Sequence, residues 1–195
     1  GGSVILAAAD DGYIYSIKDD ASSGLVLAGQ TFIEGENIVS MVESNGLIFF
    51  STAQTTSGGG KIGRIYNASI DSDGVLYTLV NRQLIKQFGD GDTTVDKSPT
   101  SLFATRDQIY FGVIESGSES DLYSIYLPTL GYARDIYYTG TSGLVESICV
   151  VKDRLFFNVK AQGLVKENST YVESGYLLLA AADFYTSQKK QWVIG

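Results

Sequence analysis

The chain contains no histidine and a single cysteine among its 195 residues. The absence of histidine excludes Ser-His-Asp and Cys-His catalytic groups and histidine-ligated zinc or iron. One cysteine cannot form an internal disulfide, and the apolar neighbours of Cys149 predict a small buried side chain rather than a reactive thiol. The glycine spacings of the P-loop and of dinucleotide-binding folds are absent as well. The sequence therefore favours a non-catalytic role.

Charged residues are scarce, at 18% of the chain, and acids outnumber bases to give a net charge of −8. A nucleic-acid-binding protein needs lysine and arginine to neutralise phosphates, and an anionic membrane surface attracts the same residues. No run of about 18 apolar residues is present, so no transmembrane helix is predicted. Because 44% of the residues are hydrophobic, we still expect a folded core, in a protein that binds neither nucleic acid nor membrane.

The chain repeats one short motif three times. The copies are SMVESNGLIFFS (40–51), SLFATRDQIYFG (101–112) and SICVVKDRLFFN (147–158). Each begins with serine and an apolar residue, passes through a polar pair and ends in an apolar trio rich in aromatics. Two short apolar segments joined by a tight polar turn predict a β-hairpin, and Asn-Gly is the strongest signal for such a turn.

Two further kinds of segment recur after each hairpin, and one copy of each also precedes the first hairpin. The first kind is DGYIYSIKD (11–19), GRIYNASID (63–71), SDLYSIYLP (120–128) and SGYLLLAAAD (174–183). The second kind is LVLAGQTF (25–32), GVLYTLV (74–80), YARDIYY (132–138) and KKQWVIG (189–195). Turn residues separate them, and no segment has a helical period. Each repeating unit therefore comprises four short predicted strands.

Units of four strands repeating every 46 to 61 residues resemble those of β-propeller repeat proteins, over nearly the whole chain. The resemblance implies an all-β fold with about four blades' worth of four-stranded antiparallel sheets. We expect one domain, 1–195, that is a whole propeller-type module or part of a larger one. Its blades would be 4–39, which lacks its first strand, 40–100, 101–146 and 147–195. A β-sandwich is the alternative fold, because strand alternation alone does not determine topology.

No named propeller subfamily is matched closely. Trp192 is followed by valine, so the Trp-Asp pair of WD40 repeats is missing, and the double glycine of kelch repeats does not recur. The segment SIDSDG (69–74) approaches the Asp-box of sialidases but its glycine is one position late. We interpret it as a hairpin turn.

Two acidic segments are candidate calcium sites, because carboxylates at alternate positions can converge on one Ca²⁺ ion. The first contains Asp71 and Asp73. The second contains Asp90, Asp92 and Asp96, within glycine-rich sequence. The alternative interpretation is that both are solvated turns, in which aspartate and glycine are common.

Thirteen tyrosines suggest a binding face, because amphipathic rings suit protein and sugar surfaces. Tyr137, Tyr138, Tyr171 and Tyr185 lie near expected strand ends or loops. Two segments, 81–100 and 161–174, are longer than their counterparts in other units and are predicted to be inserted loops, where function often resides.

These observations predict a binding or structural module that contacts a protein partner, or further copies of itself, through strand edges and the inserted loops. Its composition is similar to that of virion tail and extracellular adhesion proteins, which favours an extracellular, cell-surface or virion location. The alternative is an extracellular domain that binds a glycan or cleaves it with paired carboxylates. The sequence contains 22 acids, and their spacing alone selects no such pair.

Overall fold

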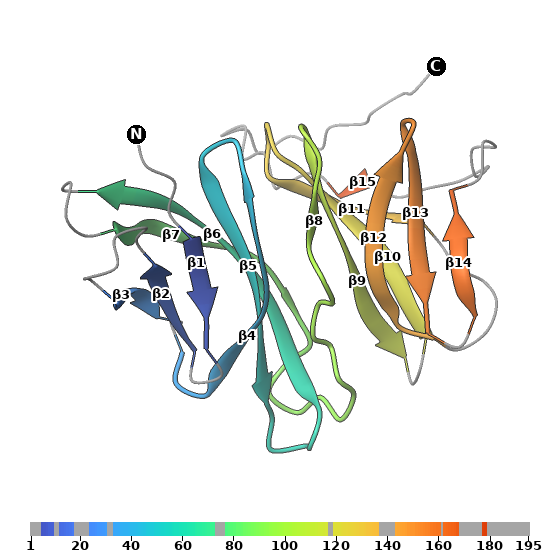
Figure 1. Ribbon diagram of the computed structural model, residues 1–195. Helices are drawn as coiled ribbons and strands as arrows, with labels where there is room; N and C mark the ends of the chain where they lie inside the picture. Colours follow the sequence, from blue (N-terminus) through green and yellow to red (C-terminus); the bar gives the residue numbers. More distant parts are fainter. Residues whose placement is uncertain are drawn as a thin grey trace, which may run out of the picture.

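A computed structural model of the chain describes residues 5–9, 12–17, 24–30, 33–72, 77–116, 119–136, 143–160, 162–167 and 177–178. These residues form fifteen strands in four antiparallel sheets (Figure 1). The prediction of an all-β fold is confirmed. Within the described ranges we find no helix that could cross a membrane, and the four sheets do not join into a closed ring.

The strands follow the chain from one sheet to the next. Sheet A consists of β1 (Ile5–Ala8), β2 (Tyr13–Ile17) and β3 (Leu25–Gln30). Sheet B consists of β4 (Glu36–Ser44), β5 (Leu47–Thr55), β6 (Lys61–Ser72) and β7 (Tyr77–Phe88). Sheet C contains β8 (Phe103–Ala104), β9 (Gln108–Ser116), β10 (Glu119–Tyr126) and β11 (Gly131–Ile136), with β15 (Leu177–Leu178) beside β11. Sheet D consists of β12 (Val145–Val151), β13 (Arg154–Val159) and β14 (Gly163–Lys166).

The repeated motif folds as the predicted hairpin in sheets B, C and D. Asn45 and Gly46 both have positive φ angles, of 53° and 78°, between β4 and β5. Lys152 and Asp153 do so between β12 and β13, at 50° and 60°. Two consecutive positive φ angles define the turn whose twist matches that of the flanking antiparallel strands. Glycine and asparagine adopt this conformation readily, which explains the local sequence of the first turn.

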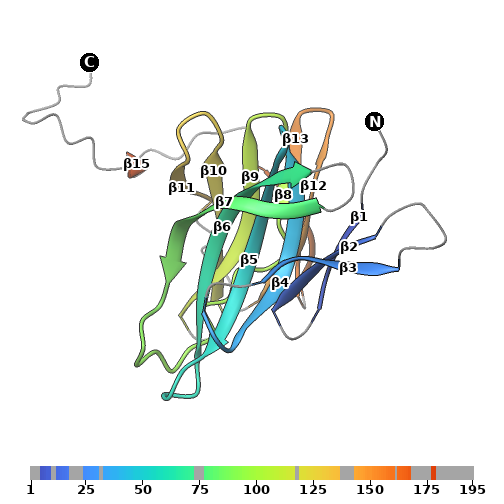
Figure 2. The ribbon, with the colours of Figure 1, turned by 90° about the vertical axis from the view of Figure 1, so that its left-hand side faces the viewer.

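A separate hydrophobic core lies between each pair of successive sheets. Between sheets A and B it includes Ile14, Ala28, Ile48, Phe50, Tyr66, Ala68 and Leu79. Between sheets B and C it includes Phe49, Ile65, Phe88, Leu102, Ile109, Phe111, Val113 and Ile125. Between sheets C and D it includes Leu122, Val145, Ile148, Leu155, Phe157 and Val159. The neighbouring side chains Phe49 and Phe50 point to opposite faces of sheet B, as successive strand residues must, and each fills a different core. Figure 2 shows sheet A in front of sheet B.

The serines that open the first two repeats join one sheet to the next. Ser40 Oγ of β4 accepts a hydrogen bond from the backbone N–H of Leu102 at 3.0 Å. Ser101 Oγ donates to the backbone carbonyl of Glu146, also at 3.0 Å. Leu102 follows Ser101 and Glu146 precedes Ser147, so both bonds end next to the opening serine of the following repeat. The strands that begin these sheets also lie together, with β8 beside both β4 and β12.

Several segments differ from their predicted structure. β7 extends to Phe88, so the first part of the predicted loop 81–100 is a strand paired with β6. β14 forms inside the predicted loop 161–174 and pairs with β13. β15 pairs with β11 of sheet C, although the repeat pattern places its sequence in the last unit, 147–195.

The prediction that Cys149 is buried is wrong, because its side chain is exposed. Cys149 stands opposite Phe156, on the face of sheet D that points away from sheet C, whereas its neighbour Ile148 stands opposite Phe157 in the core. An apolar run in a strand alternates between two faces, and here only one face is covered by a described sheet.

Candidate functional site: a buried polar network across sheet B

All four strands of sheet B contribute polar side chains to one face. In the strand register Glu36 of β4 stands opposite Gln54 of β5, Thr52 of β5 opposite Arg64 of β6, and Arg64 opposite Gln87 of β7. Directly opposed residues of antiparallel strands project to the same side of the sheet. The face is the one that carries the core shared with sheet A, so the polar group adjoins that core.

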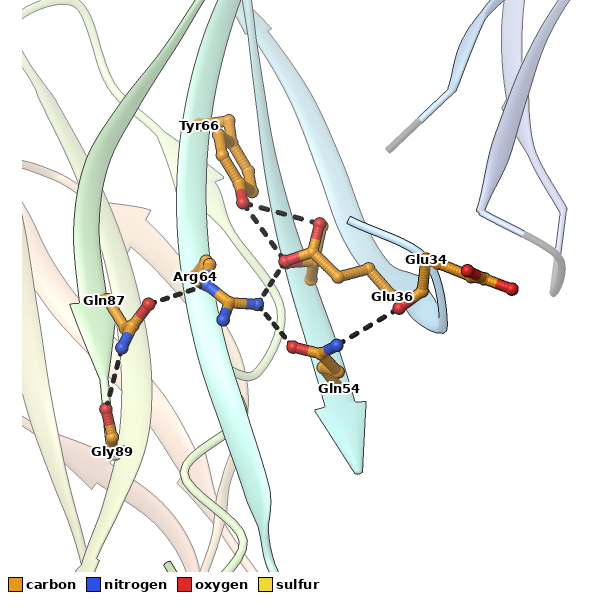
Figure 3. A network of polar contacts seen from close by, with 8 residues as sticks. Glu34, Glu36, Gln54, Arg64, Tyr66, Gln87 and Gly89 are labelled. Atoms are coloured by element: carbon orange, nitrogen blue, oxygen red, sulfur yellow. Dashed lines mark hydrogen bonds and ion pairs between the residues drawn. The ribbon is translucent and has the colours of Figure 1, made fainter. Parts of the chain in front are cut away.

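Glu36 and Arg64 form a buried ion pair at the centre of the network (Figure 3). The distance between Glu36 Oε1 and Arg64 Nη1 is 2.5 Å, and the two side chains are 0% and 7% exposed. The same carboxylate oxygen accepts hydrogen bonds from Thr52 Oγ1 and from the Tyr66 hydroxyl, each at 3.1 Å. Burying a charge is costly unless it is paired and hydrogen-bonded, and this carboxylate meets both conditions.

Two glutamine side chains connect the ion pair to the backbone at its margins (Figure 3). Arg64 Nε donates to Gln87 Oε1 at 2.8 Å, and Arg64 Nη1 donates to Gln54 Oε1 at 3.0 Å. The amide nitrogens of the glutamines donate to the carbonyls of Gly89 and Glu34, both at 3.1 Å. The network thus links the segment before β4 to the segment after β7.

Tyr66 joins the polar network to the hydrophobic core. Its ring stacks on Phe50, with centroids 5.2 Å apart and an angle of 21° between the planes. Burial and the adjacent Glu36 carboxylate, to which the hydroxyl donates, raise the pKa of Tyr66 well above its usual value. Both effects disfavour the phenolate, so the hydroxyl stays a hydrogen-bond donor.

The arrangement is suited to holding strands in register rather than to chemistry on a substrate. A general acid or base must come within hydrogen-bond reach of the group that it protonates or deprotonates. Here the Glu36 side chain is fully buried and its oxygens already accept from Arg64, Thr52 and Tyr66. A slip of one residue in any strand would turn its network member to the other face, next to the core shared with sheet C.

In the acidic segment after β7, the carboxylates of Asp90 and Asp96 contact nearby groups of the protein. Asp96 pairs with Lys61 at 3.2 Å and accepts hydrogen bonds from the backbone N–H and the hydroxyl of Ser98. Burial alone would raise the pKa of Asp96, but the bonds from Ser98 and the Lys61 ammonium outweigh it and lower the pKa. Asp90 accepts from the backbone N–H of Asp92 at 3.3 Å. These aspartates stabilise the turns of the connection.

The other predicted calcium residues behave similarly where they can be seen. Asp71 accepts a hydrogen bond from the backbone N–H of Ser72 at 2.9 Å, and Asp73 lies outside the described residues. In the described ranges no three carboxylate, cysteine or histidine side chains are grouped so that they could hold a metal ion. Calcium binding stays a prediction, which a melting temperature unchanged by added Ca²⁺ would reject.

The connection from sheet B to sheet C lies tightly against the hairpin between β5 and β6. Backbone N–H groups of Gly60 and Lys61 donate to the carbonyls of Thr93 and Val95, at 3.2 and 3.1 Å, and Thr56 Oγ1 donates to the Thr93 carbonyl at 2.7 Å. The glycines of the sequence GGGK (58–61) allow this approach, because a Cβ on Gly60 would come within 2.5 Å of the Val95 carbonyl. The predicted hairpin loop is therefore a packing surface for the acidic connection.

The tyrosines predicted to bind ligand, Tyr137, Tyr138, Tyr171 and Tyr185, lie outside the described residues. The residues of the buried network were not predicted. One signal was present in the sequence, since Arg64 interrupts the otherwise uncharged stretch from Ile62 to Ile70. A charge inside a predicted strand that is otherwise uncharged indicates a buried partner, although the sequence does not say which of the 22 acids supplies it.

No protein-family model matches the sequence, and no curated protein matches it. The structure is similar to the crystal structure of the computationally designed Ika8 protein, with a TM-score of 0.49 and 12% sequence identity. The similarity covers 82% of this chain and 41% of that chain, so this chain spans less than half the length of that protein. At this level the likeness indicates no function.

Proposed function

We propose that the protein is a non-catalytic, propeller-type module that contacts other protein chains through exposed strand edges. The architecture is supported by the serial order of the sheets, with one core between each successive pair. It is also supported by the hydrogen bonds of Ser40 and Ser101, each of which reaches a residue next to the opening serine of the following repeat. A rotational repeat of small sheets is what distinguishes a propeller from a two-layered sandwich.

The observation that carries the binding role is the incomplete edge of sheet A. In sheets B, C and D the second strand of the unit, β5, β9 or β13, pairs with a first strand, β4, β8 or β12. β1 holds the position of those second strands, yet within the described part of the chain it pairs with β2 alone. An unpaired strand edge presents N–H and C=O groups that can pair with another chain.

Strand addition is the matching mode of recognition, in which a partner supplies one extended segment and the main chain supplies most of the affinity. The connection 89–102 is held against the β5–β6 hairpin by Thr56 and Lys61, which makes a strand edge a better-supported contact than this inserted segment.

A peptide test follows from the repeat. The peptide of residues 35–44, GENIVSMVES, is the first strand of sheet B and a surrogate for the one that β1 lacks. We expect it to bind the chain in fluorescence anisotropy and to raise the melting temperature with peptide concentration, because a ligand of the folded state stabilises that state. A scrambled peptide of the same composition is the control. Equal binding of both peptides, or of neither, would refute strand addition at β1.

A further inference from the structure

The face of sheet A that points away from sheet B is largely apolar or aromatic. The register places Ile5 opposite Ile17 and Ile17 opposite Leu25, and it places Ala7 opposite Tyr15 and Tyr15 opposite Leu27. Directly opposed residues share a face, as do alternate residues of one strand. The apolar and aromatic residues of this outer face of sheet A are Ile5, Ala7, Tyr13, Tyr15, Ile17, Leu25 and Leu27, and Gln30 stands opposite Tyr13 at its edge.

The outer face of sheet A is also open to solvent. Ile5 is 63% exposed, Leu25 64% and Leu27 51%, and no charged side chain stands among the seven. The rings of Tyr13 and Tyr15 lie next to each other, with centroids 6.4 Å apart. A contiguous apolar face of this kind on a folded protein marks an interaction surface.

Sheet D has an outer face as well, and this face combines apolar with charged side chains. The face of sheet D that points away from sheet C is defined by three pairs of opposed residues. They are Cys149 with Phe156, Phe156 with Lys166, and Asn158 with Leu164. Val151 and Arg154 pair on the same side. Val151 is 51% exposed and Leu164 70%, while Arg154 and Lys166 add two cations.

The order of the sheets relates these two faces. Sheet B packs on sheet A with one face and on sheet C with the other, and sheet C lies in the same way between B and D. Each sheet therefore has one face for its predecessor and one for its successor. Among the described residues, no sheet packs on the outer face of sheet A, where a preceding sheet would lie. None packs on the outer face of sheet D either, where a following sheet would lie. Ser147 stands at the same open end, where its hydroxyl, unlike those of Ser40 and Ser101, bonds no described residue.

We propose that copies of this chain associate head to tail, with the outer face of sheet D of one copy packed on the outer face of sheet A of the next. Such a contact repeats the interface already present between A and B, B and C, and C and D. It covers the exposed leucines, and it brings the cations of one face to the tyrosine rings of the other, where they are attracted by the ring faces. The proposal rests on the propeller-type stacking proposed above, but it concerns sheet faces rather than the β1 edge.

Light scattering on a sizing column tests the association directly. We expect the chain to elute with a mass above that of one copy. The variant Leu25→Glu/Leu27→Glu, altered on the outer face of sheet A, should elute as one copy, because it places charge in an apolar contact. Leu84→Glu is the matched control, since Leu84 is a 47% exposed leucine of β7 on sheet B, away from both outer faces, and it should keep the larger mass. A native chain with the mass of one copy would overturn the proposal.

Mixing two blocked variants distinguishes a head-to-tail contact from other self-association. The variant Val151→Glu/Leu164→Glu blocks sheet D and should also elute as one copy. Mixed with the sheet A variant it should form a dimer of two chains, because each partner contributes its one unaltered face. A contact between two like faces predicts no such dimer, and a mixture that stays at one chain mass would overturn the proposal. Circular dichroism verifies that both variants keep their β-structure.

Cys149 supplies an independent readout, because it stands on the outer face of sheet D. In the sheet A variant, which cannot cover the sheet D face of a neighbour, a thiol reagent should label Cys149 rapidly. In the native assembly labelling should be slowed, and equal rates in both proteins would contradict the proposed contact. The peptide test at the β1 edge does not depend on these outcomes, so failure of either proposal can be recognised separately.

Discussion

Glu36 and Arg64 are 28 positions apart in the chain, yet their side chains meet at 2.5 Å in the interior of sheet B. The pair joins the first strand of the sheet to its third, and the glutamines beside it extend the connection to the second and fourth. A contact between buried charges tolerates little misalignment, because a charge displaced from its partner is left without compensation. We interpret the pair as the element that selects one strand register for sheet B.

Replacing Arg64 by methionine should destabilise the protein strongly. The variant leaves the Glu36 carboxylate buried without its cation, and breaking a buried pair in this way costs about 3–5 kcal/mol of unfolding free energy. Urea unfolding measures the loss. The double variant Glu36→Leu/Arg64→Met should recover much of it, since it removes both charges. The exposed pair of Lys61 and Asp96 is the control, and Lys61→Met should cost at most about 1 kcal/mol.

Tyr66 should make the protein sensitive to alkali. Its pKa is raised in the folded state by burial and by Glu36, so the folded protein keeps the phenolic proton when the unfolded chain has lost it. Unfolding free energy therefore falls as the pH rises above about 10, the pKa of an unperturbed tyrosine. Tyr66→Phe removes the titrating group and should flatten this decline relative to the parent. Parallel pH curves for the two proteins would show that other groups cause it.

Asp96 should make the stability of the protein depend on pH under acidic conditions. Its pKa is lowered in the folded state, so the unfolded chain takes up the proton first as the pH falls. The contribution of Asp96 to stability is present above about pH 4, the pKa of an unperturbed aspartate, and is lost as the pH falls through the lower folded value. In thermal melts from pH 6 down to pH 2, Asp96→Asn should show a shallower decline than the parent protein. An unaltered slope would mean that the contacts of Asp96 with Lys61 and Ser98 contribute little.

Gly63 should not tolerate a side chain. A Cβ at this position would lie 2.2 Å from the Lys97 carbonyl oxygen and 2.4 Å from Pro99 Cδ, so the connection after β7 would have to move. Overpacking of this kind typically costs about 1–3 kcal/mol, and we expect Gly63→Ala to lower the unfolding free energy by that amount. Gly91→Ala is the control within the same connection, because no heavy atom lies within 4 Å of its added Cβ. Similar losses for both variants would contradict the close packing of the connection.

The parts of the fold that depend on neighbouring residues were predictable. Asn45-Gly46 and Lys152-Asp153 were identified as turns because their backbone preferences are local, and the repeated apolar trios located the central strands. The pairing of β15 with β11 was not predictable, because it joins residues far apart in sequence and rests on two residues in each strand. The exposure of Cys149 depends on whether the outer face of sheet D is covered, which an apolar run does not reveal.

The candidate site was missed for a related reason. The apolar neighbours of Arg64 in the sequence indicate that it has a buried partner. That partner, Glu36, stands at the very start of a strand, where an acid is usually solvated. The acidic segment from Asp90 to Asp96 was predicted to bind calcium because its acids are close together in sequence. In the structure the oxygens of Asp90 and Asp96 accept hydrogen bonds from nearby N–H and hydroxyl groups, which is the ordinary use of aspartate in turns.

The pairing of β15 with β11 has a consequence for how the molecule comes apart. Sheet D lies in the chain between these two strands, so it occupies a loop whose ends are fastened to sheet C. If sheet D melts while β15 stays in place, the released segment remains tethered at both ends and gains less conformational entropy than a free tail would. The terminal sheet of a linear array is normally the first to fray. Here sheet D is anchored on both sides by strands of sheet C. A force applied to the chain beyond β15 would have to break the β11–β15 pairing before it acted on sheet D.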